Sequence, residues 1–347
     1  MIDLPTLARY ILTPCYGTGG SWPFGRATGS REKALKTAQN RATAGDGTQK
    51  RGSRRLRRHG RYINGAALCT LGFCTSWVID MTGQGPEWLR VEHVDLHLKH
   101  LPPGLAGLRI VHISDLHLSL SVSKRYIEHC VRRVNRLRAD VIVLTGDYTT
   151  HDPTGRFRRR AVDILARLRS RFGVFACLGN HDYGVRGILG FGYSPRMYDL
   201  IVGLRASGIH VLRNEAARLS MGDHALWLVG LGDLWARDFD PRRAFDGVPP
   251  NQPVIAMVHN PLGAERLRGF HAGAVVSGHT HGRRVQFVNS SGLRLRRRKF
   301  QAGLYDVDGK KLYVNCGLGR HGDFRPTLRP EITVLRLCEP LPHGQAV

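Results

Sequence analysis

Five short polar clusters contain the side chains of this sequence that are best suited to chemistry. Each cluster directly follows an apolar run of strand length. The clusters are SDLH with Asp115 and His117, GD with Asp147, GNHD with Asn180, His181 and Asp182, HN with His259, and GHTHG with His279 and His281. One such cluster carries little information, whereas five at strand ends indicate a shared site.

The spacing of these clusters lets them converge. In an α/β sheet the carboxyl ends of the strands face one crevice, so clusters that are far apart in the sequence can meet there. Asp115 and His117 are two residues apart, as are His279 and His281, and in an extended chain such residues project to the same side. Glycines beside the clusters allow tight turns and close backbone approach, namely Gly146, Gly179, Gly278 and Gly282.

The donor set indicates the kind of metal ion. Four imidazoles, two carboxylates and one amide, without any thiolate, suit borderline-to-hard divalent ions such as Mn, Fe or Zn. The seven cysteines form no CxxC pair, and four of them lie in apolar runs, which is typical of small buried hydrophobic residues.

The elements that must position these clusters alternate between strand and helix. Apolar runs predict strands over 108–114, 141–145 and 173–178, and helices over 123–139, 157–170 and 195–206, with Ser123 as a helix cap. This βαβαβα order predicts a parallel sheet covered by helices. Beyond Ile209 the pattern is mostly strands, so a second sheet packed on the first is expected.

The order DxH, GD, GNHD, H, GHxH resembles that of the calcineurin-like metallophosphoesterases, and the resemblance extends from about Leu89 to Leu337. Within that family the chain is most similar to the small bacterial membrane-associated or exported phosphodiesterases of the YkuE and YaeI type. The phrases that carry this similarity are LPPGLAGLRIVHISDLHLS, the VGLGDLW segment, and GLG followed by RPEITVL. The resemblance implies an α/β fold, the four-layer α/β/β/α sandwich.

The resemblance also implies roles for the clusters. The first metal ion would be held by Asp115, His117 and His281, and the second by Asn180, His259 and His279, with Asp147 bridging the two. His181 would stand beside the phosphate as a proton donor to the leaving oxygen, and Asp182 would hold its loop. Two divalent ions against two carboxylates leave a charge of about +2, which attracts phosphate, and a water shared by both ions becomes a hydroxide nucleophile near neutral pH.

The expected reaction is therefore two-metal hydrolysis of a phosphoester, as a phosphodiesterase or pyrophosphatase acting on a membrane-associated or nucleotide-linked substrate. Two departures from the family pattern concern substrate orientation. Arg283 and Arg284 follow GHTHG where this group usually has Gly-Gln, and Cys316 stands where an Arg usually precedes GLG. The basic run at 294–299 is read either as a solvated loop or as a patch for anions or lipid headgroups.

The amino-terminal region has a different composition. Residues 1–52 lack any helical or strand period and are expected to be a disordered basic tail. Residues 53–81 combine a cluster of arginines with an uncharged stretch of 18 residues (62–79), which has the form of a signal or membrane anchor; a short buried helix is the alternative. Residues 82–107 are expected to form a linker and a first strand, and 108–340 the metallophosphoesterase domain.

An uncleaved anchor is favoured because no small-x-small cleavage site follows the apolar stretch. Its basic flank would stay in the cytoplasm. We expect a bacterial protein whose catalytic domain faces the periplasm or the cell exterior.

The formal net charge of +25 favours polyanionic partners without choosing among them. Two alternatives follow, a nuclease of the same fold, and a catalytically weak anion-binding protein that uses its basic tail. The first 62 residues carry 13 Lys and Arg against 3 acidic residues. Because so much of the charge lies in the tail rather than beside the metal clusters, nucleic acid is not the favoured partner.

Overall fold

The computed structural model describes the catalytic part of the chain and the strand that precedes it. All described residues belong to one compact unit within residues 61–347. The described ranges are 89–150, 152, 154–185, 196–283, 285–289, 293–319 and 329–340.

The first sheet contains the strands that carry the amino-terminal polar clusters. Its order is β1-β14-β2-β3-β4-β5, and β2 to β5 run parallel to one another. Strand β14 pairs antiparallel with β2 and parallel with β1. The bounds are β1 Arg90–His97, β2 Arg109–Ile113, β3 Val141–Thr145, β4 Val174–Cys177, β5 Ile209–Val211 and β14 Glu331–Cys338. The predicted parallel core is confirmed.

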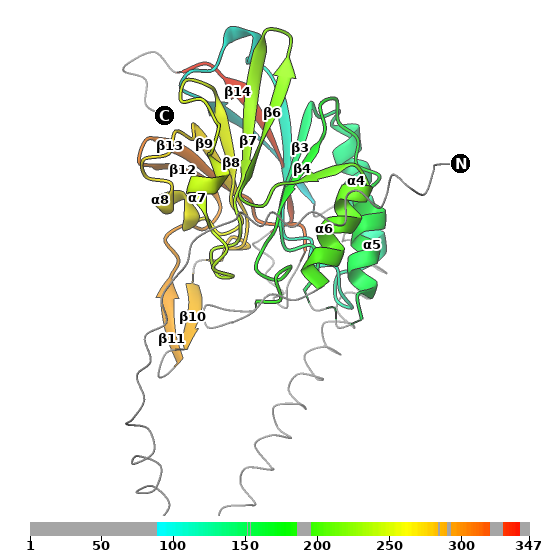
Figure 1. The fold of residues 1–347 in the computed structure, drawn as a ribbon. Helices are drawn as coiled ribbons and strands as arrows, with labels where there is room; N and C mark the ends of the chain where they lie inside the picture. The colour runs from blue at the N-terminus through cyan, green and yellow to red at the C-terminus, as the bar shows by residue number, and fades with distance from the viewer. Residues whose placement is uncertain are drawn as a thin grey trace, which may run out of the picture. The chain divides into compact units, whose positions relative to one another are not determined.

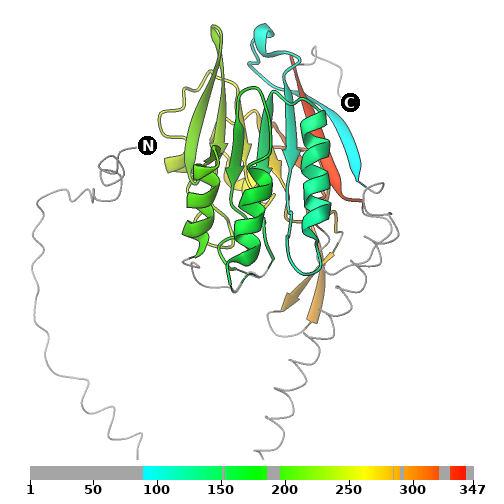
Figure 2. The same ribbon diagram turned by 90° about the vertical axis from the view of Figure 1, so that its right-hand side faces the viewer.

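Three helices cover one face of this sheet and lie side by side in Figure 2. They are α4 Lys124–Arg136, α5 Arg156–Leu165 and α6 Arg196–Ala206. Ser123 caps α4, its side chain accepting the backbone N–H of Tyr126 at 3.2 Å. Alternate side chains of each strand point toward the helices. Val111 and Ile113 of β2 therefore pack in the same apolar cluster as Ile127 of α4.

The second sheet has the order β12-β13-β9-β8-β7-β6 and carries the carboxy-terminal clusters. Two short helices, α7 Pro241–Ala244 and α8 Gly263–Arg266, pack on its outer face, and a hairpin of β10 Val285–Asn289 and β11 Leu293–Arg297 projects from the same side (Figure 1). The bounds are β6 Glu215–Met221, β7 His224–Gly230, β8 Val254–Met257, β9 Ala274–Ser277, β12 Gly303–Val307 and β13 Lys310–Val314. A 3-10 turn, η2 Pro103–Leu105, follows β1.

Three separate apolar clusters fill the spaces between four layers. One lies between the three long helices and the first sheet, one between the two sheets, and one between the second sheet and the short helices. Ile110 of β2 points into the inter-sheet cluster, opposite to its neighbour Val111. Strands buried on both faces explain the continuous apolar runs in the sequence. The expected four-layer α/β/β/α sandwich is confirmed.

Some predicted boundaries were wrong. Helix α5 ends at Leu165 rather than near Ser170, because Asn135 of α4 binds the next turn, donating to the Arg167 carbonyl and accepting from the Arg169 N–H. The run at 294–299 was read either as a solvated loop or as a patch for anions or lipid headgroups; its first four residues form most of β11, which pairs antiparallel with β10, so the loop reading was wrong. Strands β5, β6 and β12 were not anticipated individually.

The predicted tail at 1–52 and the predicted anchor at 53–81 lie outside the described residues. Among the residues that the structure does describe, none forms a helix of the length and apolarity needed to cross a bilayer.

Candidate metal centre

The polar clusters lie on loops that leave the carboxyl ends of β2, β3, β4, β8 and β9. Five of their residues adopt the left-handed backbone conformation, with φ between 48° and 69°: Asp115, His117, Asp147, His279 and His281. Asp and His tolerate this conformation better than most side chains, although it still costs free energy. The pairs at 115/117 and 279/281 therefore reach the site through left-handed turns, and the extended geometry expected from their spacing was wrong.

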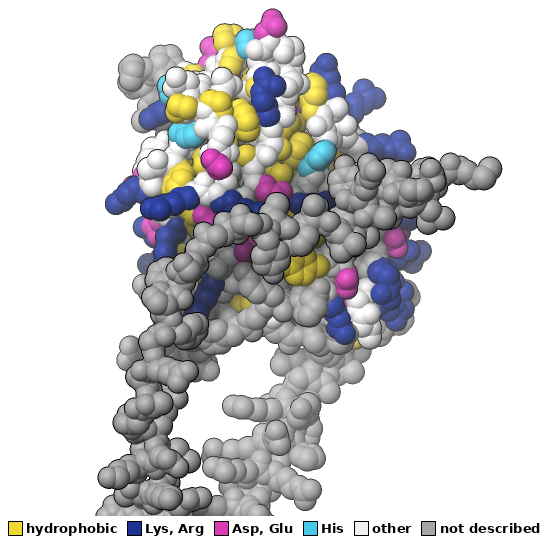
Figure 3. All heavy atoms as spheres, viewed as in Figure 1, with side chains coloured by type: hydrophobic (Ala, Val, Ile, Leu, Met, Phe, Trp, Pro, Cys, Tyr) yellow, Lys and Arg dark blue, Asp and Glu magenta, His cyan; other side chains and the backbone are white. Residues whose placement is uncertain are grey.

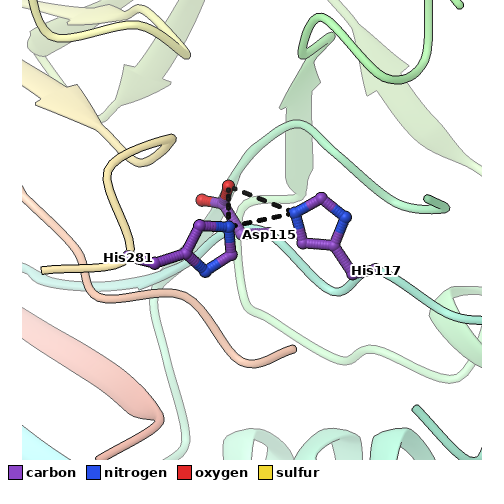
Figure 4. Close-up of side chains that lie close together, drawn as sticks. All are labelled: Asp115, His117 and His281. Atoms are coloured by element: carbon purple, nitrogen blue, oxygen red, sulfur yellow. Dashed lines mark hydrogen bonds and ion pairs between the residues drawn. The ribbon is translucent and has the colours of Figure 1, made fainter. Parts of the chain in front are cut away.

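The first group joins the loop after β2 to the loop after β9. The side chains of Asp115, His117 and His281 point toward one another (Figure 4). Nε2 of His117 lies 3.1 Å from Nε2 of His281, and Oδ1 of Asp115 lies 3.4 Å from Nε2 of His281 and 3.8 Å from Nε2 of His117.

The second group joins the loops after β3, β4, β8 and β9. Asp147, His259 and His279 lie close enough to share an ion, and the amide oxygen of Asn180 lies beside both histidines. Oδ1 of Asn180 lies 3.2 Å from Nε2 of His259 and 3.1 Å from Nδ1 of His279. Asp147 stands between the two groups, because its Oδ2 lies 3.2 Å from Nε2 of His259 and 3.6 Å from Nε2 of His117.

These separations fit metal binding. Ligand atoms at about 2.1 Å from a shared ion lie about 3.0–3.4 Å from one another, close to the spacing within both groups. Oδ1 of Asp115 is buried and has no hydrogen-bond partner among the described residues, although it faces two imidazoles. A buried carboxylate oxygen without a donor is costly unless a cation satisfies it. The residues present therefore fit divalent ions.

The pKa values of the clustered side chains also favour the binding of a cation. Burial would raise the pKa of Asp115, but His281 and His117 outweigh it and hold that pKa below its ordinary value. Burial lowers the pKa of His281 to about 3, so its imidazole is neutral and keeps a lone pair for a metal ion. At His259 the Asp147 carboxylate outweighs burial and raises the pKa well above its ordinary value, which marks a place where positive charge is stabilised.

Hydrogen bonds behind the groups fix the ring orientations. Nδ1 of His259 donates to the Thr145 carbonyl at 2.6 Å, which leaves Nε2 facing Asp147 and Asn180. Nδ1 of His117 lies 3.0 Å from the hydroxyl of Thr150. Such partners set the tautomer and direction of a metal-binding imidazole.

His181 lies beside both groups but is less buried than His117 or His259. Its Nδ1 donates to the Thr150 carbonyl at 3.1 Å, and its ring stands perpendicular to that of His117 with centroids 5.0 Å apart. With His117 and Asp147 it forms a third set that could hold a metal ion.

Asp182 holds the loop that carries Asn180 and His181. Its carboxylate accepts the backbone N–H groups of Asp147, Gly179 and Tyr148 at 2.8 to 3.0 Å. Burial and the nearby Asp147 carboxylate raise the pKa of Asp182 to about 7, while these N–H donors oppose the rise. The carboxylate thereby joins the loop after β3 to the loop after β4.

Comparison with known proteins identifies the family. Residues 108–283 match the family model described as calcineurin-like phosphoesterase. The chain belongs to this family. The phosphoesterase is 32% identical over 306 residues to UDP-2,3-diacylglucosamine pyrophosphatase LpxG of Chlamydia trachomatis, a match covering 74% of this chain and 91% of LpxG.

Two further relatives extend the comparison. Phosphodiesterase YaeI of Escherichia coli is 30% identical over 254 residues, covering 73% of this chain and 89% of YaeI. The transmembrane protein with metallophosphoesterase domain of Bos taurus is 30% identical over 334 residues, covering 91% of this chain and 66% of that protein. The phosphoesterase is thus a metal-dependent hydrolase of phosphoric esters, as its sequence predicted.

Glycines let the loops of the phosphoesterase approach one another. A Cβ added at Gly278 would fall 1.9 Å from Oγ of Ser114 and 2.1 Å from Oδ2 of Asp115. One added at Gly179 would fall 2.3 Å from Oδ1 of Asp147. The predicted need for glycine at these two positions is confirmed.

Sequence reasoning missed several supporting residues. The VGLGDLW segment was recognised only as a family phrase, yet Trp235 contacts His279, and Asp233 accepts the backbone N–H groups of Trp235 and Ala236, both at 2.8 Å. The GLG phrase at 317–319 was likewise recognised only as a family phrase, although the Gly319 N–H donates to the Asp115 carbonyl at 2.7 Å. A buried Asp two residues before a Trp at a strand end was the available signal for the first of these.

Proposed function

We propose that this phosphoesterase uses two divalent metal ions to hydrolyse a phosphodiester or pyrophosphate bond in a nucleotide-linked substrate that has a lipid portion. The observation that carries the proposal is the position of Asp147, whose Oδ2 lies within 3.6 Å of an imidazole nitrogen from each ligand group. The printed names of LpxG, a pyrophosphatase, and YaeI, a phosphodiesterase, support the choice of bond.

In this proposal the ligand roles follow the two groups. Asp115, His117 and His281 hold the first ion, Asn180, His259 and His279 hold the second, and Asp147 bridges them. Mn, Fe and Zn all suit this set of nitrogen and oxygen donors. Bound there, the ions would polarise the phosphate and lower the pKa of water toward neutrality.

In this proposal the protein's own residues hold the reacting groups in place, and one of them donates a proton to the leaving oxygen. His181 stands at the more exposed side of the centre, and its Nδ1 donates to the Thr150 carbonyl. In this proposal the doubly protonated imidazole of His181 gives its Nε2 proton to the leaving oxygen. Its backbone N–H donates to Oδ1 of Asp147 at 2.9 Å, which keeps the proposed acid and the proposed bridge in fixed relation.

We extend the proposal to location. The arrangement of a basic tail at 1–52, an anchor at 53–81, a linker with the first strand at 82–107 and the catalytic domain at 108–340 would hold the metal centre near a bilayer, on its periplasmic or extracellular side. A relative named a transmembrane protein matches 91% of this chain, which supports membrane association.

The nuclease alternative requires a continuous basic groove for a polyanion. In the view of Figure 3, Lys and Arg side chains are scattered over the visible described surface among apolar and acidic ones. Because 13 Lys and Arg residues lie in the first 62 residues of the chain rather than beside the metal clusters, a compact phosphoester is favoured over a nucleic-acid chain as substrate.

The test is a substrate panel with the purified full-length protein in Mn, Zn or Fe. It compares UDP-2,3-diacylglucosamine, bis(4-nitrophenyl) phosphate and single-stranded DNA. We expect hydrolysis of the first two and little cleavage of DNA. Preferential cleavage of DNA would replace the proposal by the nuclease alternative, and no turnover of any substrate would favour the anion-binding protein.

A matched variant tests the bridge. Asp147→Asn should lower the metal content and abolish hydrolysis, because a neutral amide cannot serve two cations as a carboxylate does, while circular dichroism stays unchanged. Full activity in Asp147→Asn would overturn the two-metal mechanism.

A further inference from the structure

A hydrogen-bond network stands behind the loop at 179–185, which follows β4 and carries Asn180 and His181. Tyr183 lies two residues after His181 in this loop, and its side chain is fully buried. The Tyr183 hydroxyl donates to Oδ2 of Asp238 at 2.5 Å. Burial raises the pKa of Tyr183 and the Asp238 carboxylate raises it further, so the hydroxyl keeps its proton and remains a donor. The loop after β4 is thereby fixed to the segment that follows β7.

Arg213, which follows β5, holds the carboxylate of Asp238 in one orientation. Nε of Arg213 donates to Oδ2 of Asp238 at 2.6 Å, and Nη2 donates to Oδ1 at 2.8 Å. The two side chains are only 24% and 12% exposed, so salt in the solvent screens the pair little. The planar fork of a guanidinium fixes a carboxylate in direction as well as in place. Oδ2 of Asp238 is therefore held facing the Tyr183 hydroxyl.

The backbone around Asp238 is fixed as well. The side-chain N–H of Asn214 donates to the Asp238 carbonyl at 2.6 Å, and its side-chain oxygen accepts the backbone N–H of Gly232 at 2.8 Å. The Asp238 N–H donates to the Asp233 carbonyl at 3.1 Å. A Cβ added at Gly232 would fall 2.2 Å from the Asp238 carbonyl oxygen, so the two ends of the segment 232–238 lie in contact. This segment is thus a closed turn that holds Asp238 in place.

The segment 232–238 contacts the metal centre and the loop at 179–185 at the same time. Its Trp235 ring stands against the ring of His279, with the centroids 4.4 Å apart. Its Asp238 accepts the hydrogen bond of Tyr183. The position of the loop at 179–185 is therefore set relative to a histidine of the second ligand group.

A displacement of Tyr183 would move His181. The turn between the two residues is closed by backbone hydrogen bonds, since the Gly184 N–H donates to the His181 carbonyl at 3.0 Å and the Tyr183 N–H donates to the Gly179 carbonyl at 3.4 Å. A change at the Tyr183 hydroxyl therefore alters the position of the whole turn, including the imidazole of His181.

We propose that Asp238 is a positioning residue for the reaction, because through Tyr183 it sets the position of the His181 imidazole over the metal centre. The inference rests on the proposed function, in which His181 is the acid. The proton leaves Nε2 of His181 and bonds to the leaving oxygen as the bond from that oxygen to phosphorus breaks. Proton donation requires a heavy-atom distance of about 2.6–3.2 Å, and a misplacement of about 1 Å can cost about 100-fold in rate.

The experiment compares two diesters that differ in their need for an acid, using full-length protein saturated with Mn. The 4-nitrophenolate that leaves from bis(4-nitrophenyl) phosphate is stable without a proton, whereas the phenolate from diphenyl phosphate is a stronger base and departs more readily when it is protonated. A residue that positions the acid therefore affects diphenyl phosphate more, while a loss of folded protein affects both substrates equally.

The variants are Tyr183→Phe, which removes one hydroxyl, and Asp238→Asn, which removes the charge. His181→Ala is the reference for loss of the acid. Tyr313→Phe is the matched control, because the Tyr313 hydroxyl of β13 also donates to a buried carboxylate, that of Glu331, at 2.6 Å. Metal content is measured for each variant, and hydrogen exchange of peptides covering 179–185 is measured in the metal-free protein.

We expect Tyr183→Phe and Asp238→Asn to lower kcat for diphenyl phosphate by about 10-fold and kcat for bis(4-nitrophenyl) phosphate much less, with KM and metal content unchanged. His181→Ala should show the same selectivity with a loss of about 10²-fold. Tyr183→Phe added to His181→Ala should cause no further loss, because both act on one step. Exchange at 179–185 should become faster in Tyr183→Phe, and Tyr313→Phe should not discriminate between the substrates.

Equal losses for the two substrates in Tyr183→Phe, beside a selective loss in His181→Ala, would overturn the positioning role while the proposed function stands. A missing metal ion in Tyr183→Phe would also overturn it, because the network would then act on the ligands. If His181→Ala did not discriminate between the substrates, the acid role in the proposed function would fail and the inference with it. If Asp238→Asn did not fold, Tyr183→Phe would carry the same comparison.

Discussion

The indole ring of Trp235 stands perpendicular to the imidazole ring of His279, with the two ring centroids 4.4 Å apart. Nδ1 of His279 faces Asn180 and His259, so its Nε2 points away from the second ligand group. That Nε2 is buried, and no residue in the described part of the chain gives it a conventional hydrogen-bond partner. We infer that the indole face accepts this N–H, in the place usually taken by a carbonyl or carboxylate.

Trp235→Leu should weaken metal binding at the second group. An N–H to π contact is weaker than a conventional hydrogen bond, so we expect a loss of about fivefold in affinity rather than the 10- to 100-fold that follows loss of a conventional partner. Titration of the chelator-treated protein with Zn measures it. Trp235→Phe, which keeps an aromatic face, should lie close to the wild type; equal losses in both variants would show that packing alone matters.

His181→Ala should separate catalysis from metal binding. Loss of a general acid lowers kcat by about 10²-fold or more, while both ions should stay bound because the two ligand groups remain complete. The measurements are kcat with an aryl phosphodiester and metal content by mass spectrometry. His181 also lies with His117 and Asp147 in a set that could hold an ion. One missing ion in His181→Ala would therefore assign it as a ligand instead.

Gly278→Ala should disturb Asp115 directly. The added Cβ would overlap the side chains of Ser114 and Asp115, both of which are buried. We expect the free energy of unfolding to fall by about 1–3 kcal/mol, as for overpacking of a core. The metal content should also fall. Gly273→Ala is the control, since its Cβ would meet nothing closer than 3.4 Å. Denaturant unfolding of both variants makes the comparison, and equal stability would contradict the crowding argument.

The sequence predicted the convergence of the site because strand ends are simple to locate. Runs such as VIVLT are buried on both faces and continuously apolar, so Asp147 could be placed at a carboxyl edge without a structure. The backbone at Asp115 and His117 could not be predicted in this way. Left-handed φ values depend on contacts from distant loops, such as the Gly319 N–H that binds the Asp115 carbonyl.

Supporting groups were harder to predict than ligands. Thr150 contacts His117 through its hydroxyl and His181 through its backbone carbonyl. Trp235 contacts His279 through its aromatic ring. No spacing rule connects either residue with these histidines. Strand β11 was missed although the sequence alternates Leu and Arg at 293–296, because the high charge of the run was given more weight than its period of two.

The last prediction concerns membrane attachment, and it rests on the order of a basic cluster, an apolar stretch and the catalytic domain. The 18 uncharged residues of 62–79 would span about 27 Å as a helix, just enough for a thin bilayer. Lys and Arg at seven positions from 50 to 61 would keep the preceding side in the cytoplasm and would add about 1 kcal/mol each through anionic headgroups. Attachment should therefore be sensitive to both salt and detergent. Fractionation of the full-length protein is compared with a truncated chain that starts at Gly83. If the full-length protein proved as soluble in low-salt buffer as the truncated one, the anchor would be abandoned, and with it the preference for a lipid-containing substrate.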